Sequence, residues 1–171
     1  MRLLLAIAPE QFRDEELETP KRVFEEAGID VDIASTIAGT CTGMLGATAE
    51  ATMTFDDVDP DNYDGIVVVG GAGSQDHLWG SERLVALVRA FFEQGKVVAA
   101  ICLAPVVLAR AGILAGRQTT VYQSPAAVAE MKKAGANLLS IPVVADMQVV
   151  TANGPHAAAQ FADTVISKLE C

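Results

Sequence analysis

The segment that most constrains the fold is a short apolar run leading directly into a cysteine. Val97 to Ile101 are all small or β-branched apolar residues, a pattern typical of a central parallel strand covered on both faces. Cys102 follows at once, and Pro105 suits the first turn of a helix, where its missing N–H is not needed. The pattern therefore places Cys102 at the carboxyl end of a sheet strand and beside a helix N-terminus.

This position of Cys102 favours a chemical role. Ligands and catalytic groups collect at the carboxyl edge of parallel sheets, and the positive end of a helix stabilises a thiolate. The turn from strand to helix is similar to a nucleophile elbow, in which backbone N–H groups stabilise an oxyanion. Leu103 and Gly71 are the candidate donors. The alternative interpretation is that Cys102 is a small buried apolar residue, as many free cysteines are.

Strands and helices alternate along the rest of the chain. Strands are expected over residues 2–8, 30–35, 64–69, 97–101, 118–122, 142–145 and 148–152, and helices over residues 20–27, 81–93, 105–111, 125–133 and 156–169. Residues 10–18 are expected to form an acidic loop before a helix that begins at Thr19-Pro20, and residues 36–56 one or two short strands outside the main repeat. The alternation predicts one α/β domain over residues 1–171, a three-layer sandwich with a mostly parallel central sheet.

Composition excludes several classes of function. The net charge of −10, without clustered Lys and Arg, disfavours a nucleic-acid partner. Cys41, Cys102 and Cys171 are widely spaced without a CxxC motif, which argues against a disulfide framework or a metal site. The glycines after residue 69 lack the spacing of a nucleotide-binding loop, so no cofactor is expected. No signal peptide or membrane-length apolar run is found, so a cytoplasmic location without membrane contact is expected.

A reactive thiol needs a group that sets its ionisation. The acidic segment Asp14-Glu15-Glu16 follows the first strand and is expected at the same sheet edge as Cys102, where a carboxylic acid can exchange a proton with the thiol. The two histidines, His77 and His156, are the candidate bases. For all of these side chains the ordinary alternative is a solvated loop residue.

Five segments together resemble the ThiJ/PfpI superfamily, flavodoxin-like proteins that include intracellular peptidases and a deglycase and chaperone associated with parkinsonism. The segments are Asp14-Glu-Glu-Leu-Glu-Thr-Pro20, Tyr63-Asp-Gly-Ile-Val-Val-Val-Gly-Gly71, Gly95-Lys-Val-Val-Ala-Ala-Ile-Cys102-Leu-Ala-Pro105, Ala111-Gly-Ile-Leu-Ala-Gly-Arg117 and Thr151-Ala-Asn-Gly-Pro155. The resemblance covers nearly the whole chain. It implies that Cys102 is the elbow cysteine, that Glu16 hydrogen-bonds it, and that the protein forms a homodimer or higher homo-oligomer.

The chain departs from both functional branches of that superfamily. The peptidase-like branch has a histidine directly after the cysteine, where this chain has Leu103, and takes a glutamate from a neighbouring subunit where Gln75 stands. The deglycase branch has a histidine and an arginine where Tyr122 and Asn153 stand. Neither branch's full site is therefore present, and a histidine would have to supply a base by another route, such as across a dimer interface.

These observations lead to one preferred function and two alternatives. The preferred function is attack of Cys102 on small reactive carbonyls or glycated groups, as in a deglycase or glyoxalase. The alternatives are a PfpI-type cysteine peptidase or amidase acting on a peptide, and a non-enzymatic redox sensor or chaperone that uses an oxidisable Cys102. The candidate catalytic residues are Cys102, Glu16, Gly71, Leu103 and His77, and the candidate substrate-binding residues are Gly70, Tyr122, Asn153 and His156.

Overall fold

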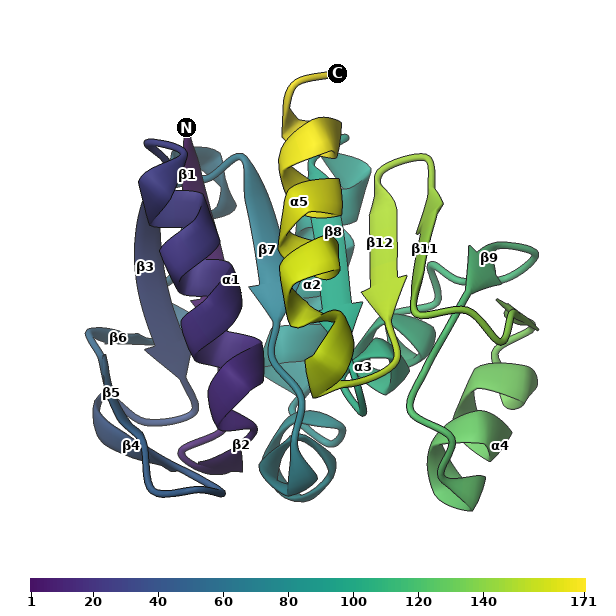
Figure 1. Ribbon diagram of the computed structural model, residues 1–171, viewed down its shortest axis with the longest axis horizontal. Coiled ribbons are helices and arrows are strands. Elements are labelled where there is room, and N and C mark those ends of the chain that lie inside the picture. Colours follow the sequence, from purple (N-terminus) through teal and green to yellow (C-terminus); the bar gives the residue numbers. More distant parts are fainter.

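The protein is a three-layer α/β sandwich, described over residues 1–171 by a computed structural model (Figure 1). Seven strands form the central sheet in the order β11-β12-β8-β7-β1-β3-β6. Their bounds in chain order are β1 Arg2–Ala6, β3 Asp30–Ser35, β6 Met53–Thr54, β7 Gly65–Val68, β8 Val97–Ile101, β11 Val143–Asp146 and β12 Val149–Ala152. All neighbours are parallel except β11 and β12, which confirms the predicted α/β class and mostly parallel sheet.

Helices cover both faces of this sheet. Their bounds are α1 Asp14–Glu26, α2 Glu82–Glu93, α3 Pro105–Arg110, α4 Pro125–Lys133 and α5 Ala158–Leu169. α1 and α5 lie side by side on one face, and α2 and α3 pack on the other (Figure 1). Alternate strand residues supply the two cores, because Leu4 packs on the side of α2 whereas Leu3 and Leu5 pack on the side of α1 and α5.

Smaller elements lie outside the main sheet. A three-stranded sheet joins β2 (Glu10–Phe12), β4 (Gly39–Gly43) and β5 (Thr48–Ala51), and a two-stranded sheet joins β9 (Gln118–Thr119) and β10 (Asn137–Leu138). A single π-helical turn, Ser74–Leu78, follows β7, and 3-10 turns occur at Phe55–Asp57, Pro60–Asn62 and Pro155–Ala157. No helix combines the length and the apolar character needed to span a membrane.

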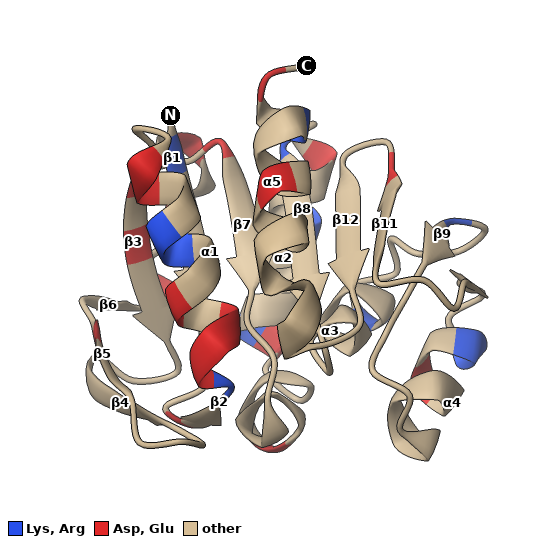
Figure 2. Ribbon diagram, viewed as in Figure 1, with Lys and Arg blue, Asp and Glu red and all other residues tan.

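The expected acidic loop over residues 10–18 is wrong. The chain forms β2 there, and α1 then begins at Asp14, so that Pro20 lies inside the helix instead of starting it. Three acidic residues in the first turn of α1 face the positive end of the helix dipole, which favours the earlier start (Figure 2). As a consequence, Glu16 projects from a helix and not from a loop.

The structure differs from the expected strands in two further segments. The strand expected over residues 118–122 ends at Thr119, because the Thr120 N–H donates to the side chain of Thr151 and the Tyr122 N–H to the carbonyl of Cys102. Within residues 36–56, β4 and β5 are the two short strands expected outside the main repeat, and they pair as an antiparallel hairpin. A third strand that was not expected, β6, joins the edge of the main sheet.

Candidate active site

Cys102 occupies a strained turn at the carboxyl end of β8. Its φ of +65° lies in the left-handed region, which is uncommon for a residue other than glycine. Two backbone hydrogen bonds hold it there: its N–H donates to Ala152 at 2.8 Å, and its carbonyl accepts from Tyr122 at 2.9 Å. α3 begins three residues later at Pro105, as expected. The thiol therefore sits on a rigid elbow between β12 and the segment after β9.

The side chains of Glu16 and Cys102 approach each other beside the backbone of Gly70. The Glu16 side chain is fully buried, although its residue type is seldom buried without a partner. A Cβ placed on Gly70 would lie 2.5 Å from Glu16 Oε1 and 2.6 Å from Cys102 Cβ. Both side chains thus press against the same point of the backbone. Gly70, expected as a substrate contact, lies directly beside both side chains.

Gly70→Ala is expected to disrupt this site. The added methyl group would overlap Glu16 and Cys102, and relief of such overpacking typically costs about 1–3 kcal/mol of folding free energy. Denaturant unfolding should show that loss. The control is Gly80→Ala, because a Cβ there meets no atom within 4 Å. Equal stability of the two variants would contradict the close contact at Gly70.

Burial governs the ionisation of Glu16. Removal from water raises its pKa from 4.5 to about 8, against the lowering effects of the Cys102 thiol, the Arg13 charge and the Gly70 N–H. Neither carboxyl oxygen of Glu16 makes a hydrogen bond of regular length and angle. The Glu16 and Cys102 side chains are therefore in contact without a fixed hydrogen bond between them. At neutral pH the carboxyl group holds its proton.

Burial also raises the pKa of Cys102, to about 12, and an ionised Glu16 adds to the rise. The backbone N–H groups of Gly71 and Leu103 favour the thiolate and partly oppose this rise. Desolvation opposes the expected stabilisation of a thiolate by the helix N-terminus and exceeds the backbone contribution, and α3 has only six residues. Two buried acids in contact titrate as a pair, and the pair loses its first proton near pH 8.

Arg13 is a site residue that the sequence prediction missed. Its N–H donates to the Gly70 carbonyl at 3.0 Å, and its guanidinium group forms a two-pronged ion pair with Glu15, at 2.9 and 3.0 Å. The positive charge lowers the pKa of Glu16. An arginine directly before three acidic residues was visible in the sequence, but only the early start of α1 brings it to the site.

The two histidines are not joined to the thiol. His77 lies in the π-helical turn after β7, and its Nε2 pairs with Glu10 Oε1 at 3.2 Å. His156 lies in a 3-10 turn, is exposed and makes no hydrogen bond. Neither ring hydrogen-bonds Cys102 or Glu16 in this structure. No group of three or more His, Cys, Asp or Glu side chains is arranged to hold a metal ion.

Tyr122 and Asn153 flank the elbow on the side of β12. Tyr122 is bound to Cys102 through its backbone, and its residue surface is 48% exposed. Asn153 follows β12 directly, and its buried Oδ1 has no hydrogen-bond partner. An unpaired buried acceptor is costly unless something donates to it, so Asn153 is available to a donor group on a ligand.

Comparisons with known proteins agree with this architecture. The model of the DJ-1/PfpI family matches residues 1–168. An uncharacterised protein of Methanocaldococcus jannaschii is 50% identical over 169 residues, which are 99% of this chain and 82% of that protein. A deglycase of Pyrococcus horikoshii is 36% identical over 152 residues, 89% of this chain and 90% of that one.

A solved structure gives the same result. The ThiJ/PfpI domain protein of Brachyspira murdochii superimposes with a TM-score of 0.95 at 34% identity, covering 99% of this chain and 96% of that one. The match spans every element that forms the elbow, the buried carboxyl group and the sheet between them. Fold, family model and sequence relatives thus agree over almost the full length, and the chain belongs to the DJ-1/PfpI family.

Proposed function

We propose that this protein acts on small reactive carbonyl compounds or glycated groups through Cys102, as a deglycase or glyoxalase does. The observation that carries the proposal is the contact of Glu16 and Cys102 over Gly70, which places a proton-holding carboxyl group beside a thiol at a strained elbow. The deglycase names of relatives 35–36% identical to this chain support the choice of substrate class.

The first step is addition of the thiol to an aldehyde. Once the pair has lost one proton, the sulfur forms a bond to the carbonyl carbon, the C=O π pair moves to oxygen, and the remaining proton of the pair passes to that oxygen through Glu16. Gly71 and Leu103 N–H groups, which already face the sulfur, can stabilise the developing oxyanion. The product is a hemithioacetal on Cys102.

For a 2-oxoaldehyde the later steps need only water. Transfer of the aldehyde-carbon proton to the neighbouring carbon with Glu16 as carrier, and of the hydroxyl proton to the neighbouring oxygen, converts the hemithioacetal into a thioester of a 2-hydroxy acid. Hydrolysis consumes one water, releases the 2-hydroxy acid and restores the thiol. In a glycated amine the sulfur would replace the nitrogen on the same carbon, the C–N bond would break, and the amine would leave with the remaining proton of the pair. No net oxidant or reductant enters this sequence, and no cofactor is needed for it.

The alternatives have less support. A cysteine peptidase needs a base beside the thiol to activate it and to protonate a leaving amine, but His77 pairs with Glu10 and Leu103 carries no base. A redox sensor would use the same Cys102 and Glu16 pair, but the deglycase names of relatives favour a carbonyl substrate.

The test is incubation of the purified protein with methylglyoxal, without added cofactor, and quantification of lactate. The proposal expects lactate in proportion to methylglyoxal consumed, at a rate that rises with pH through about 8 as Glu16 loses its proton. A fluorogenic peptide assayed in parallel should not be cleaved. Peptide cleavage without lactate formation would favour the peptidase and contradict the proposal.

A further inference from the structure

A chain of contacts connects the thiol elbow to the single tryptophan of the sequence. The indole Nε1 of Trp79 donates to the carbonyl oxygen of Leu103 at 2.8 Å. Leu103 is the residue directly after Cys102, and its backbone N–H lowers the pKa of the thiol. Trp79 is 6% exposed, so water does not readily replace this hydrogen bond.

The Leu103 carbonyl depends on Trp79 because the helix does not use it. In a regular helix this oxygen would accept from the N–H four residues later, on Val107. The Val107 N–H instead donates to Ala104 at 2.9 Å, in the tighter pattern of a 3-10 turn. The indole is the only group that hydrogen-bonds the Leu103 carbonyl.

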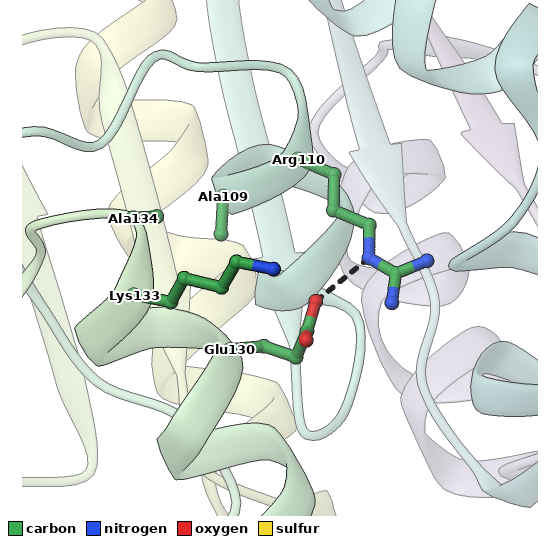
Figure 3. A pocket seen from close by; sticks show the side chains of 5 residues that line it. All are labelled: Ala109, Arg110, Glu130, Lys133 and Ala134. Carbon is green, nitrogen blue, oxygen red and sulfur yellow. Dashed lines mark hydrogen bonds and ion pairs between the residues drawn. The ribbon is translucent and has the colours of Figure 1, made fainter.

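Trp79 is itself fixed from two sides. Its N–H closes the π-helical turn on Ser74 at 3.0 Å, and single π turns of this kind are frequent at functional sites. Arg110 donates through Nη1 to the Trp79 carbonyl at 2.9 Å and lies 5.7 Å from the centre of its ring. Arg110 is held in turn by Glu130 at 2.8 Å, beside a surface cavity of about 290 Å³ between α3 and α4 (Figure 3).

We infer that Trp79 is a positioning residue for the thiol site: its indole N–H holds the Leu103 carbonyl and thereby keeps the Leu103 N–H directed at the Cys102 sulfur. The effect on turnover rests on the proposed function, whereas the effect on the thiol itself does not. Trp79 touches no substrate in this role and acts only through Leu103.

Trp79→Phe tests the inference, because it keeps an aromatic ring and removes the N–H. Loss of one hydrogen bond to a buried acceptor should lower kcat for methylglyoxal about tenfold with KM unchanged within about twofold. Alkylation of Cys102 by iodoacetamide should slow at pH 7, and its midpoint should move to higher pH, because the Leu103 N–H lowers the pKa of the thiol.

Tyr63→Phe is the matched control. It also removes one part-buried donor, the Tyr63 hydroxyl that donates to Asp32 at 2.8 Å, in the same apolar core but away from the elbow. The control should leave the alkylation profile of Cys102 unchanged. An unchanged profile in folded Trp79→Phe, or the same change in both variants, would overturn the inference.

A second measurement leaves Trp79 in place. In Cys171→Ser, a background without the exposed cysteine, alkylation of Cys102 should shift the emission of Trp79, and Cys102→Ala added to it should abolish the shift. If the emission of Trp79 does not change when Cys102 is alkylated, the inference is overturned, even if Trp79→Phe did not fold. Absence of lactate with a shifted alkylation profile would contradict the proposed function and leave the positioning role supported.

Discussion

Cys102→Ser is expected to abolish conversion of methylglyoxal, with a fall in kcat/KM of about 10³-fold or to the uncatalysed rate. A hydroxyl group in the same place is nearly isosteric but far less acidic than a thiol, and burial raises the pKa of the side chain still further. Neither histidine hydrogen-bonds residue 102, so neither would activate the serine. Lactate formation measured against enzyme concentration gives the result.

The control for this variant is Cys171→Ser. Cys171 is exposed, and its thiol group hydrogen-bonds only the carbonyl of Ser167. Its replacement should therefore leave both turnover and stability unchanged. Circular dichroism should show that Cys102→Ser is folded. Turnover that persists in folded Cys102→Ser would show that Cys102 is not the nucleophile.

Glu16→Gln is expected to remove a large pH dependence of folding stability. The pKa of Glu16 is about 8 in the folded protein and near 4.5 in the unfolded chain, so between these values the folded state binds more protons. The contribution of protonated Glu16 to the free energy of unfolding is fully present below pH 4.5 and is lost as the pH rises through 8. The shift between the two pKa values corresponds to about 5 kcal/mol of unfolding free energy. The variant should therefore gain stability relative to the wild-type protein as the pH rises from 5 to 8.

The control is Glu15→Gln, one residue away. The hydrogen bond from Arg13 lowers the pKa of Glu15, so its contribution is lost only at acidic pH and stays constant between pH 5.5 and 8. Urea unfolding at several pH values measures both differences, provided that the m-values match. A stability difference for Glu16→Gln that does not change with pH would contradict the buried, protonated carboxyl group.

The sequence predicted the parts of this fold that depend on periodicity. The apolar run into Cys102 predicted β8 and its elbow, and the amphipathic pattern over residues 81–93 predicted α2, which begins at Glu82 with Ser81 as its N-cap. These elements form wherever local pattern and burial agree. The family resemblance pointed to Glu16, and the structure brings its carboxyl group to Cys102.

Other features depend on contacts distant in sequence and were not predictable from pattern. Pro20 suggested a helix start, but the proline lies inside α1, whose first turn places Asp14 where its carboxylate accepts from the N–H groups of Leu45 and Ala47. The resting state of Cys102 depends on how far neighbouring segments exclude water, which a local motif does not contain. The role of Trp79 requires the fold, because Leu103 lies 24 residues away.

The central claim is that Cys102 and Glu16 titrate as one pair, and the pH dependence of Cys102 alkylation, followed by intact mass in the wild-type protein and Glu16→Gln, tests it most directly. In the wild type the first proton leaves the pair near pH 8, and the negative charge that remains on the pair raises the pKa for loss of the thiol proton. In Glu16→Gln that negative charge is absent, so the alkylation midpoint should fall by about one pH unit or more. Coincident profiles, or a higher midpoint in the variant, would contradict the account.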